Sequence, residues 1–204
     1  MKKKVILISL FFIILLIILF FCKFNYKKIK FGNNESNKSV DQIKEYILNI
    51  NSYTAVLDVT TISNKNTNKY ILEQSYKKGA YEEQKVNKPE NIEGTTIIYK
   101  DNTLEIKNSK LNLSKIYNDY PYLSNNVLCL SSFIEDCNKN LEKINIYEQN
   151  NDIVFELSTS INAYLGKRTL YLEKGTGKPK KMVVQDDNNK DIIYILYNEI
   201  DIKN

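Results

Sequence analysis

The feature that most constrains this chain is an apolar run near its N-terminus. Lys2, Lys3 and Lys4 precede residues 5–22, in which Ser9 is the single clearly polar side chain. The run approaches the ~20 residues that a helix needs to cross a ~30 Å hydrocarbon core. A secretory signal peptide has a shorter apolar middle that ends in small residues, whereas this run ends Leu-Phe-Phe-Cys. The sequence therefore predicts that residues 1–30 form a signal anchor with basic flanks, whose residues 5–22 contact the membrane and hold the rest of the chain outside the cytoplasm.

Cys22, the last residue of the run, leaves a second kind of anchor open. A bacterial lipoprotein signal also ends in a cysteine, which then carries the lipid, but it has a small residue where this chain has Phe21. Retention of the helix is therefore the first expectation, and lipid attachment at Cys22 is the alternative. Both place the same domain outside the cytoplasm at the same membrane.

The charge of the chain is concentrated in the predicted anchor. Seven of the 29 basic residues lie within residues 1–30, which contain no acid, so residues 31–204 carry 22 basic and 24 acidic side chains. This near-neutral remainder has no basic stripe for a phosphate backbone, and nucleic acid is excluded as a partner.

The absence of histidine limits the chemistry that this chain could perform. Without histidine there is no Ser-His or Cys-His nucleophile pair and no imidazole ligand for zinc. Cys129 and Cys137 are eight residues apart on a predicted helix, about 12 Å along its axis, too far for a disulfide. We expect them to be buried thiols. The adjacent acids Glu135 and Asp136 are predicted to be solvated. No catalytic residue, metal site or cofactor is predicted, and the chain is expected not to be an enzyme.

The remaining sequence predicts one domain. Residues 31–39 are a polar linker, and Ser39 with Gln42 forms a capping-box pattern before a short amphipathic helix at 40–50. A second amphipathic helix is expected from Leu123 to Cys137. The other segments alternate in polarity and are separated by turn residues, which is typical of strands. The segments expected to be strands are 53–60, 70–76, 80–86, 95–99, 104–107, 111–116, 143–148, 153–159, 168–173, 180–185 and 191–197.

This order of elements predicts an α+β fold. About ten meandering strands form a strongly curved antiparallel sheet, an incomplete barrel, wrapped around one or two helices, because strand twist accumulates across a sheet of this size. The last strand, residues 192–197, is apolar on both faces. A central strand has this pattern, and so does an edge strand that exchanges between two copies. A homodimer formed by strand exchange is therefore a further hypothesis.

Several small motifs stand at the start and at the end of the domain. At the start they are Tyr53-x-Ala55 after the first helix and Gly79-x-Tyr81. Near the end, Gly177-x-Pro179-x-x-Met182 precedes the last strand. These motifs resemble the LolA/LolB-like lipoprotein carriers. Within that fold, the segment Asn126-Val127-x-x-Leu130-Ser131-Ser132-Phe133-Ile134 resembles the germination lipoproteins of the GerS family in spore-forming clostridia. The resemblance covers residues 40–204.

The resemblance implies a function that patterning alone does not. Members of the GerS family support a cortex N-acetylmuramoyl-L-alanine amidase during sporulation, so that muramic-δ-lactam forms in the spore peptidoglycan. It also implies a position between the forespore and mother-cell membranes. Carriers of the LolA type usually have a tryptophan where this chain has residues 96–99, and a buried arginine that holds a lid; this chain has no tryptophan, and its single arginine, Arg168, does not match that position. These differences and the retained anchor favour a fixed accessory protein over a shuttle.

Two functional hypotheses follow for the domain. The first is a membrane-tethered accessory protein that binds an amidase; Tyr117, Tyr120 and Tyr122, just before the second helix, are its candidate partner contacts, because tyrosine gives rigid contact area. The alternative is a LolA-like binding protein that holds a lipid or an acylated peptide in the concave face of the sheet. A filled core would favour the first, and an open apolar cavity of at least ~300 Å³ would favour the second.

Overall fold

The computed structural model of this protein describes residues 38–119, 126–162 and 165–204. The predicted anchor, Cys22, and Tyr120 and Tyr122 lie outside these residues, so the expectations attached to them stay predictions. Within the described residues, no helix has both the length and the apolar composition required to cross a membrane.

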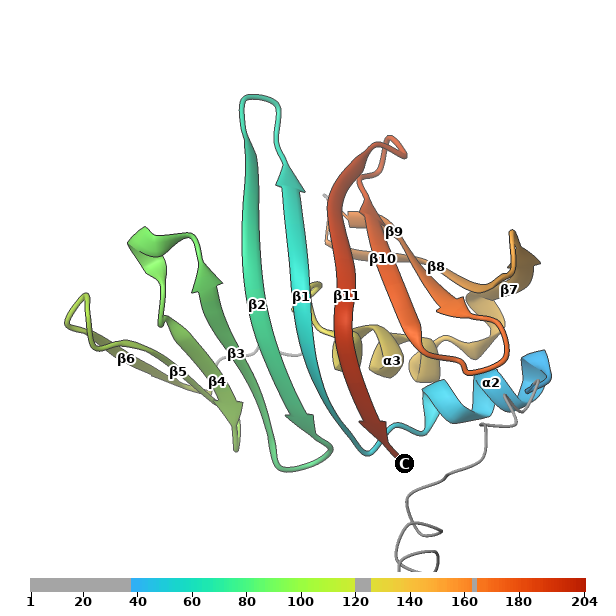
Figure 1. Cartoon of the computed structure of the whole chain (residues 1–204), viewed down its shortest axis with the longest axis horizontal. Helices are drawn as coiled ribbons and strands as arrows, with labels where there is room; N and C mark the ends of the chain where they lie inside the picture. Colours follow the sequence, from blue (N-terminus) through green and yellow to red (C-terminus); the bar gives the residue numbers. More distant parts are fainter. Residues whose placement is uncertain (1–37, 120–125, 163–164) are drawn as a thin grey trace, which may run out of the picture. The chain divides into compact units, whose positions relative to one another are not determined.

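Eleven strands form one antiparallel sheet, one at each of the segments expected to be strands (Figure 1). They are β1 (Ser52–Ile62), β2 (Thr67–Lys77), β3 (Tyr81–Lys88), β4 (Thr96–Lys100), β5 (Thr103–Asn108), β6 (Leu113–Asn118), β7 (Ile144–Gln149), β8 (Asp152–Asn162), β9 (Leu165–Glu173), β10 (Pro179–Gln185) and β11 (Asp191–Lys203). Their order across the sheet is β6-β5-β4-β3-β2-β1-β11-β10-β9-β8-β7. The sheet is open, with β6 and β7 at its two edges; the α+β class is confirmed.

The first helix, α2 (Val40–Leu48), begins as the sequence predicts. Ser39 is its N-cap: the Ser39 hydroxyl accepts from the Gln42 backbone N–H at 3.3 Å, and the Gln42 side chain accepts from the Ser39 N–H at 2.9 Å. This capping box satisfies two backbone donors that would otherwise lack partners. Ile43 and Ile47 on the inner face are fully buried.

The second helix, α3 (Leu130–Lys139), begins later than the apolar periodicity predicts. Cys129 is its N-cap and has an extended backbone, with φ −93° and ψ 134°. The expected start at Leu123 is therefore wrong for residues 126–129, and Cys129 and Cys137 do not lie on one continuous helix. Both cysteines are free thiols and both are buried, as expected.

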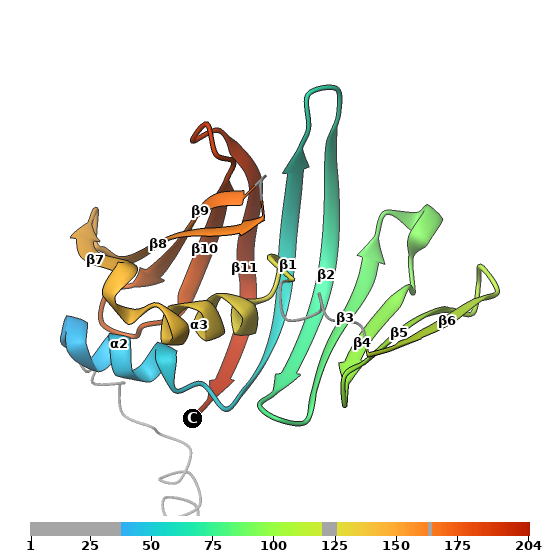
Figure 2. The ribbon, with the colours of Figure 1, turned by 180° about the vertical axis from the view of Figure 1, so that it is seen from behind.

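Both helices lie on the same face of the half of the sheet that contains β7–β11 and β1 (Figures 1 and 2). The core between helices and strands is made of interdigitating apolar side chains, among them Leu57, Leu130, Phe133, Phe155 and Leu170, each fully buried. Burial of one such side chain contributes about 1.5–3 kcal/mol. This half of the domain is therefore filled.

The other half of the sheet, β3–β6, extends beyond the helices (Figures 1 and 2). Its apolar side chains are less completely covered: Thr96–Tyr99 on β4 are half-buried, and every residue of β6 is exposed. The two helices therefore leave these strands uncovered.

The last strand, β11, lies at the centre of the sheet, between β1 and β10. It is longer than expected and continues to Lys203, with a register shift opposite Val56 and Leu57. The central position agrees with one of the two expectations for this segment. Burial on both faces does not, because Leu196 on the outer face is 46% exposed. Strand exchange between two copies stays a prediction.

Candidate functional site

The segment that precedes α3 is attached to β1, β2 and β3 by polar side chains that point to the inner face of the sheet. Asn126 donates to Gln84 Oε1 at 3.1 Å, and Gln74 donates to the Leu128 carbonyl at 3.0 Å. The Ser131 hydroxyl donates to the Glu82 carboxylate. Gln74 and Gln84 are buried, so these contacts satisfy groups whose desolvation would otherwise be costly.

Tyr53 on β1 joins this network beneath the start of α3. Its hydroxyl donates to Gln74 Oε1 at 3.3 Å and lies 3.5 Å from the backbone nitrogen of Ser131. Burial is the main reason that the pKa of Tyr53 is raised well above its usual value, and the nearby Cys129 and Glu82 act in the same direction. Tyr53 therefore stays neutral and serves as a hydrogen-bonding group.

Arg168 on β9 attaches the middle of α3 to the other half of the sheet. The side chain is only 1% exposed and forms an ion pair with Asp136, whose side chain is 15% exposed. The guanidinium also donates to the Ser132 hydroxyl at 3.4 Å and lies 5.3 Å from the centre of the Phe133 ring. The expectation that Asp136 is a solvated surface acid is thus wrong, whereas Glu135 is exposed.

These contacts explain the motif Asn126–Ile134. Asn126, Ser131 and Ser132 supply the hydrogen bonds that hold the helix, and Leu130 and Phe133 supply the buried apolar surface. Arg168 could have been found in the sequence, because it continues the inward alternation of Leu170 and Leu172. Charged residues are rarely buried without a partner, so the pattern alone does not predict that Arg168 is buried.

A groove of about 690 Å³ lies beside α3, and we call it the α3 groove. Its floor includes Tyr76, Glu82 and Tyr99, which are cross-strand neighbours on β2, β3 and β4. α3 forms one wall, and the β2–β3 and β4–β5 turns form the others. Further lining residues are Leu48, Ile50, Lys77, Lys78, Gly79, Ala80, Tyr81, Lys100, Asp101, Asn102, Ser131, Ser132, Ile134, Glu135, Asn138 and Lys139.

The α3 groove has a mixed lining, with apolar and aromatic side chains beside charges of both signs. The pKa of Tyr76 is raised by burial and then by the carboxylates of Glu82 and Glu135. Lys139 pairs with Glu135 at 2.6 Å, and Lys100 lies 4.0 Å from Asp101. The groove exceeds ~300 Å³, but its charged lining residues distinguish it from the purely apolar cavity expected of a lipid carrier.

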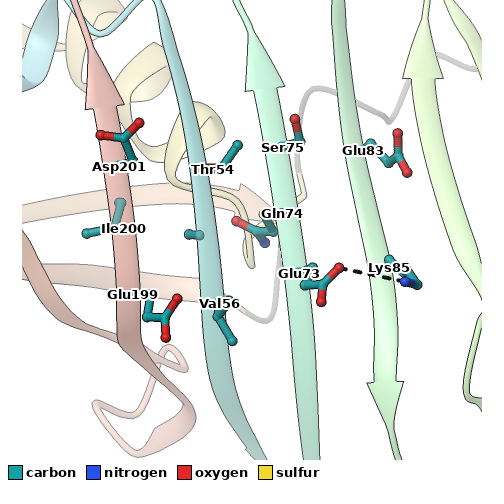
Figure 3. A pocket seen from close by; sticks show the side chains of 11 residues that line it. Thr54, Val56, Glu73, Gln74, Ser75, Glu83, Lys85, Glu199, Ile200 and Asp201 are labelled. Carbon is teal, nitrogen blue, oxygen red and sulfur yellow. Dashed lines mark ion pairs between the residues drawn. The ribbon is translucent and has the colours of Figure 1, made fainter.

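A second hollow, of about 540 Å³, lies on the opposite face of the sheet (Figure 3). Acidic side chains surround it, from Glu73, Glu83, Glu199 and Asp201; Lys85 lies 3.8 Å from Glu73. No group of three or more acidic or cysteine side chains in the described part of the chain is arranged to hold a metal ion. We interpret this hollow as a solvated face.

Tyr117, one of the three predicted partner contacts, lies on the edge strand β6. Leu111, Leu113 and Ile116 are exposed with it, with exposed fractions from 36% at Tyr117 to 59% at Ile116. Leu113 and Tyr117 lie on one face of the strand and Ile116 on the other. The nitrogen of Lys115 lies 5.5 Å from the centre of the Tyr117 ring. We call residues 111–117 the β6 edge.

Comparison with known families identifies the group to which this sequence belongs. The family model of the YdcC-like sporulation proteins matches residues 2–204. The chain belongs to the YdcC-like sporulation protein family. No curated protein sequence matches it.

Solved structures share the fold. The GerS lipoprotein, in its complex with the CwlD amidase from Clostridioides difficile, is 24% identical with a TM-score of 0.53, over 80% of this chain and 93% of that chain. An uncharacterized conserved protein from Thermus thermophilus is 10% identical with a TM-score of 0.51, over 82% and 89%. The LolA superfamily protein NE2245 from Nitrosomonas europaea is 12% identical with a TM-score of 0.42, over 82% and 94%. This YdcC-like protein therefore resembles GerS, as its sequence motifs predict.

Proposed function

We propose that this YdcC-like protein is a non-enzymatic, membrane-tethered accessory protein of sporulation. It acts outside the cytoplasm by binding a cortex N-acetylmuramoyl-L-alanine amidase, so that muramic-δ-lactam forms in the spore peptidoglycan. Membership of a sporulation family supports the setting. The likeness in fold to GerS, which was solved together with an amidase, supports the kind of partner.

The observation that carries a protein-binding role is the β6 edge. In the described residues, four of the seven large apolar side chains that are exposed lie within residues 111–117. An edge strand also has backbone donors and acceptors that are not used by the sheet, so it can accept another strand or a partner's apolar surface. Tyr117 contributes a rigid ring to this surface.

The test is capture of the full-length tagged protein from a detergent extract of sporulating cells, with mass spectrometry of the retained proteins and lipids. We expect a stoichiometric amidase with the unmodified chain and little amidase with Ile116→Lys. Leu196→Lys is the matched control, because Leu196 is similarly exposed, at 46%, on the outer face of the central strand β11. Equal capture by all three proteins would exclude the β6 edge, and absence of any amidase would exclude the proposed partner.

A second measurement tests the role in the cell. Spores of a deletion strain should lack muramic-δ-lactam in muropeptide profiles, and Ile116→Lys should reproduce this defect while Leu196→Lys does not. Normal muramic-δ-lactam in the deletion strain contradicts the accessory role.

The lipid-binding alternative depends on the volume of the α3 groove. At about 690 Å³ the groove could hold part of an acyl chain, and Leu48, Ile50 and Ile134 are among its lining residues. Glu82 on the floor and four lysines at the rim argue against an apolar ligand, because burying them without partners is costly. Lipid or acylated peptide retained without any amidase, in the same capture experiment, would support this alternative.

A further inference from the structure

The α3 groove has the features of a ligand site that is separate from the β6 edge. Three segments far apart in the sequence enclose it: residues 76–82, residues 99–102 and one side of α3. Its volume, about 690 Å³, lies within the ~300–1,000 Å³ that is usual for sites of small ligands.

The floor of the groove favours a molecule with flat, C–H-rich faces and many hydroxyl groups. Tyr76 and Tyr99 lie on either side of Glu82 along one cross-strand row. The face of an aromatic ring is electron-rich and attracts the C–H groups of a sugar ring. Glu82 between the two rings, with Asn102 and Asn138 nearby, supplies acceptors and donors for hydroxyl groups.

The rim of the groove favours carboxylates on that molecule. Lys100 and Lys139 each have an acidic neighbour, Asp101 and Glu135. Lys78, in the β2–β3 turn, takes part in none of the ion pairs of the described residues. An ammonium group without a carboxylate neighbour, beside an aromatic floor, suits a ligand that combines sugar rings with negative charge.

The geometry points to the α3 groove as a binding site for a carboxylate-bearing glycan. A glycan strand of peptidoglycan from which the peptides have been removed has this chemistry, since each muramic acid then carries a free lactyl carboxylate. The sugar rings would lie on Tyr76 and Tyr99, and a carboxylate would meet Lys78. This inference goes beyond the amidase partnership and can hold or fail without it, because the ligand is bound by this chain alone.

Isothermal titration of the full-length protein in detergent, without any amidase, tests the inference. The probes are peptide-free glycan strands, chitohexaose as a neutral glycan of the same sugar type, and poly-glutamate as a charged chain without sugars. We expect the peptide-free strands to bind at least about tenfold more tightly than either other probe, because only they offer both sugar faces and carboxylates.

Groove variants locate the site. Lys78→Gln should weaken binding of peptide-free strands about tenfold, and Tyr99→Ala about fivefold. The controls are Lys65→Gln, in the β1–β2 turn, and Tyr171→Ala, on β9; both lie outside the groove and should leave binding unchanged. Melting curves identify any variant that fails to fold, and the substitution of Lys78 at an exposed turn keeps the test usable if Tyr99→Ala does not fold.

Three results would overturn the inference. They are no binding of peptide-free strands by the folded protein, binding that the groove variants leave unchanged, and equally tight binding of chitohexaose or poly-glutamate. The last result would mean that sugar rings or charge alone suffices. Loss of amidase capture in the earlier experiment affects none of these readouts.

Discussion

Arg168 of β9 and Asp136 of α3 form an ion pair across the interface between the sheet and the helix. The arginine is fully buried and the aspartate is largely so. Burial lowers the pKa of Arg168, and the carboxylate of Asp136 acts in the opposite direction and favours the charged form. The carboxylate of Asp136 thus stabilises the buried positive charge of Arg168, and neither side chain could be buried at low cost without the other.

Removal of the Asp136 carboxylate should therefore strongly destabilise the folded protein. Asp136→Asn leaves the buried guanidinium without a counter-charge, and we expect a loss of about 3–5 kcal/mol in the free energy of unfolding. Glu135→Gln is the control at the adjacent position: Glu135 pairs with Lys139 at the surface, so its loss should cost less than about 1 kcal/mol. Urea denaturation of both variants measures the difference, and similar losses would contradict the buried role of Asp136.

The polar network beneath the start of α3 should govern the local stability of that helix. Gln74→Leu removes the donor to the Leu128 carbonyl and the acceptor of the Tyr53 hydroxyl, at a cost of about 1–3 kcal/mol. Hydrogen exchange should become faster at the amides of α3. In Gln42→Ala, which removes half of the capping box of α2, faster exchange should instead be confined to α2. Unchanged exchange of α3 in Gln74→Leu would show that packing alone holds the helix.

The buried thiol of Cys137 makes the protein sensitive to alkali. Burial raises the pKa of Cys137 to about 12, whereas an exposed thiol in the unfolded chain ionises near 8.5. Between about pH 9 and pH 12 the unfolded chain loses this proton and the native protein keeps it, so stability falls as the pH rises, by up to about 1.4 kcal/mol per pH unit.

Unfolding measured from pH 7 to pH 10.5 checks this pH dependence. Cys137→Ala should lower stability at every pH but give a shallower decline above pH 9, by about one proton. An unchanged slope would mean that Cys137 is not the group responsible. In the unmodified protein, thiol reagents at pH 8 should modify Cys129 and Cys137 only after unfolding, because the thiolate is the reactive form.

Gly177 connects backbone conformation to helix packing. It has φ +77°, and an added Cβ would lie 3.2 Å from Tyr46 Cδ1 and 3.4 Å from Ile43 Cγ2 of α2. Gly79 has a similar φ of +69° but open space around it. Gly79→Ala should cost about 1–2 kcal/mol through the backbone alone, and Gly177→Ala should cost more because α2 must also shift. Melting temperatures of the two variants measure the difference. A lower melting temperature for Gly79→Ala than for Gly177→Ala would contradict the close packing of Gly177 against α2.

Strand positions could be predicted from the sequence because one face of each strand is buried. Tyr53, Ala55, Leu57 and Val59 alternate in the sequence, and all four are buried in the structure. The sequence does not predict the final residues of β11, because Glu199 and Asp201 alternate with Ile200 and Ile202 there and exposed charges are typical of a solvated tail. Apolar and charged residues still alternate in residues 199–202, but this part of the strand is less hydrophobic than residues 192–197.

The start of α3 and the α3 groove could not be predicted in this way. An apolar stripe at helical spacing does not reveal that the backbone of Cys129 is extended. The residue at which α3 begins depends on hydrogen bonds to β1, β2 and β3. The groove depends on residues 76–82, 99–102 and 131–139 meeting in space. Arg168 is a buried charge whose partner is 32 positions away in the sequence.

The strand order also sets how this sheet can assemble during folding. Every neighbouring pair of strands is consecutive in the chain except β1 and β11, so β1–β6 and β7–β11 are two meanders of local hairpins. Hairpins close short loops and form early, whereas the seam between β1 and β11 brings together segments that more than a hundred residues separate. The seam is non-local, and we expect it to form more slowly than the hairpins. A break in the chain between β6 and α3 would leave each meander's hairpins intact, and the rate at which the two pieces join would report the formation of that seam directly.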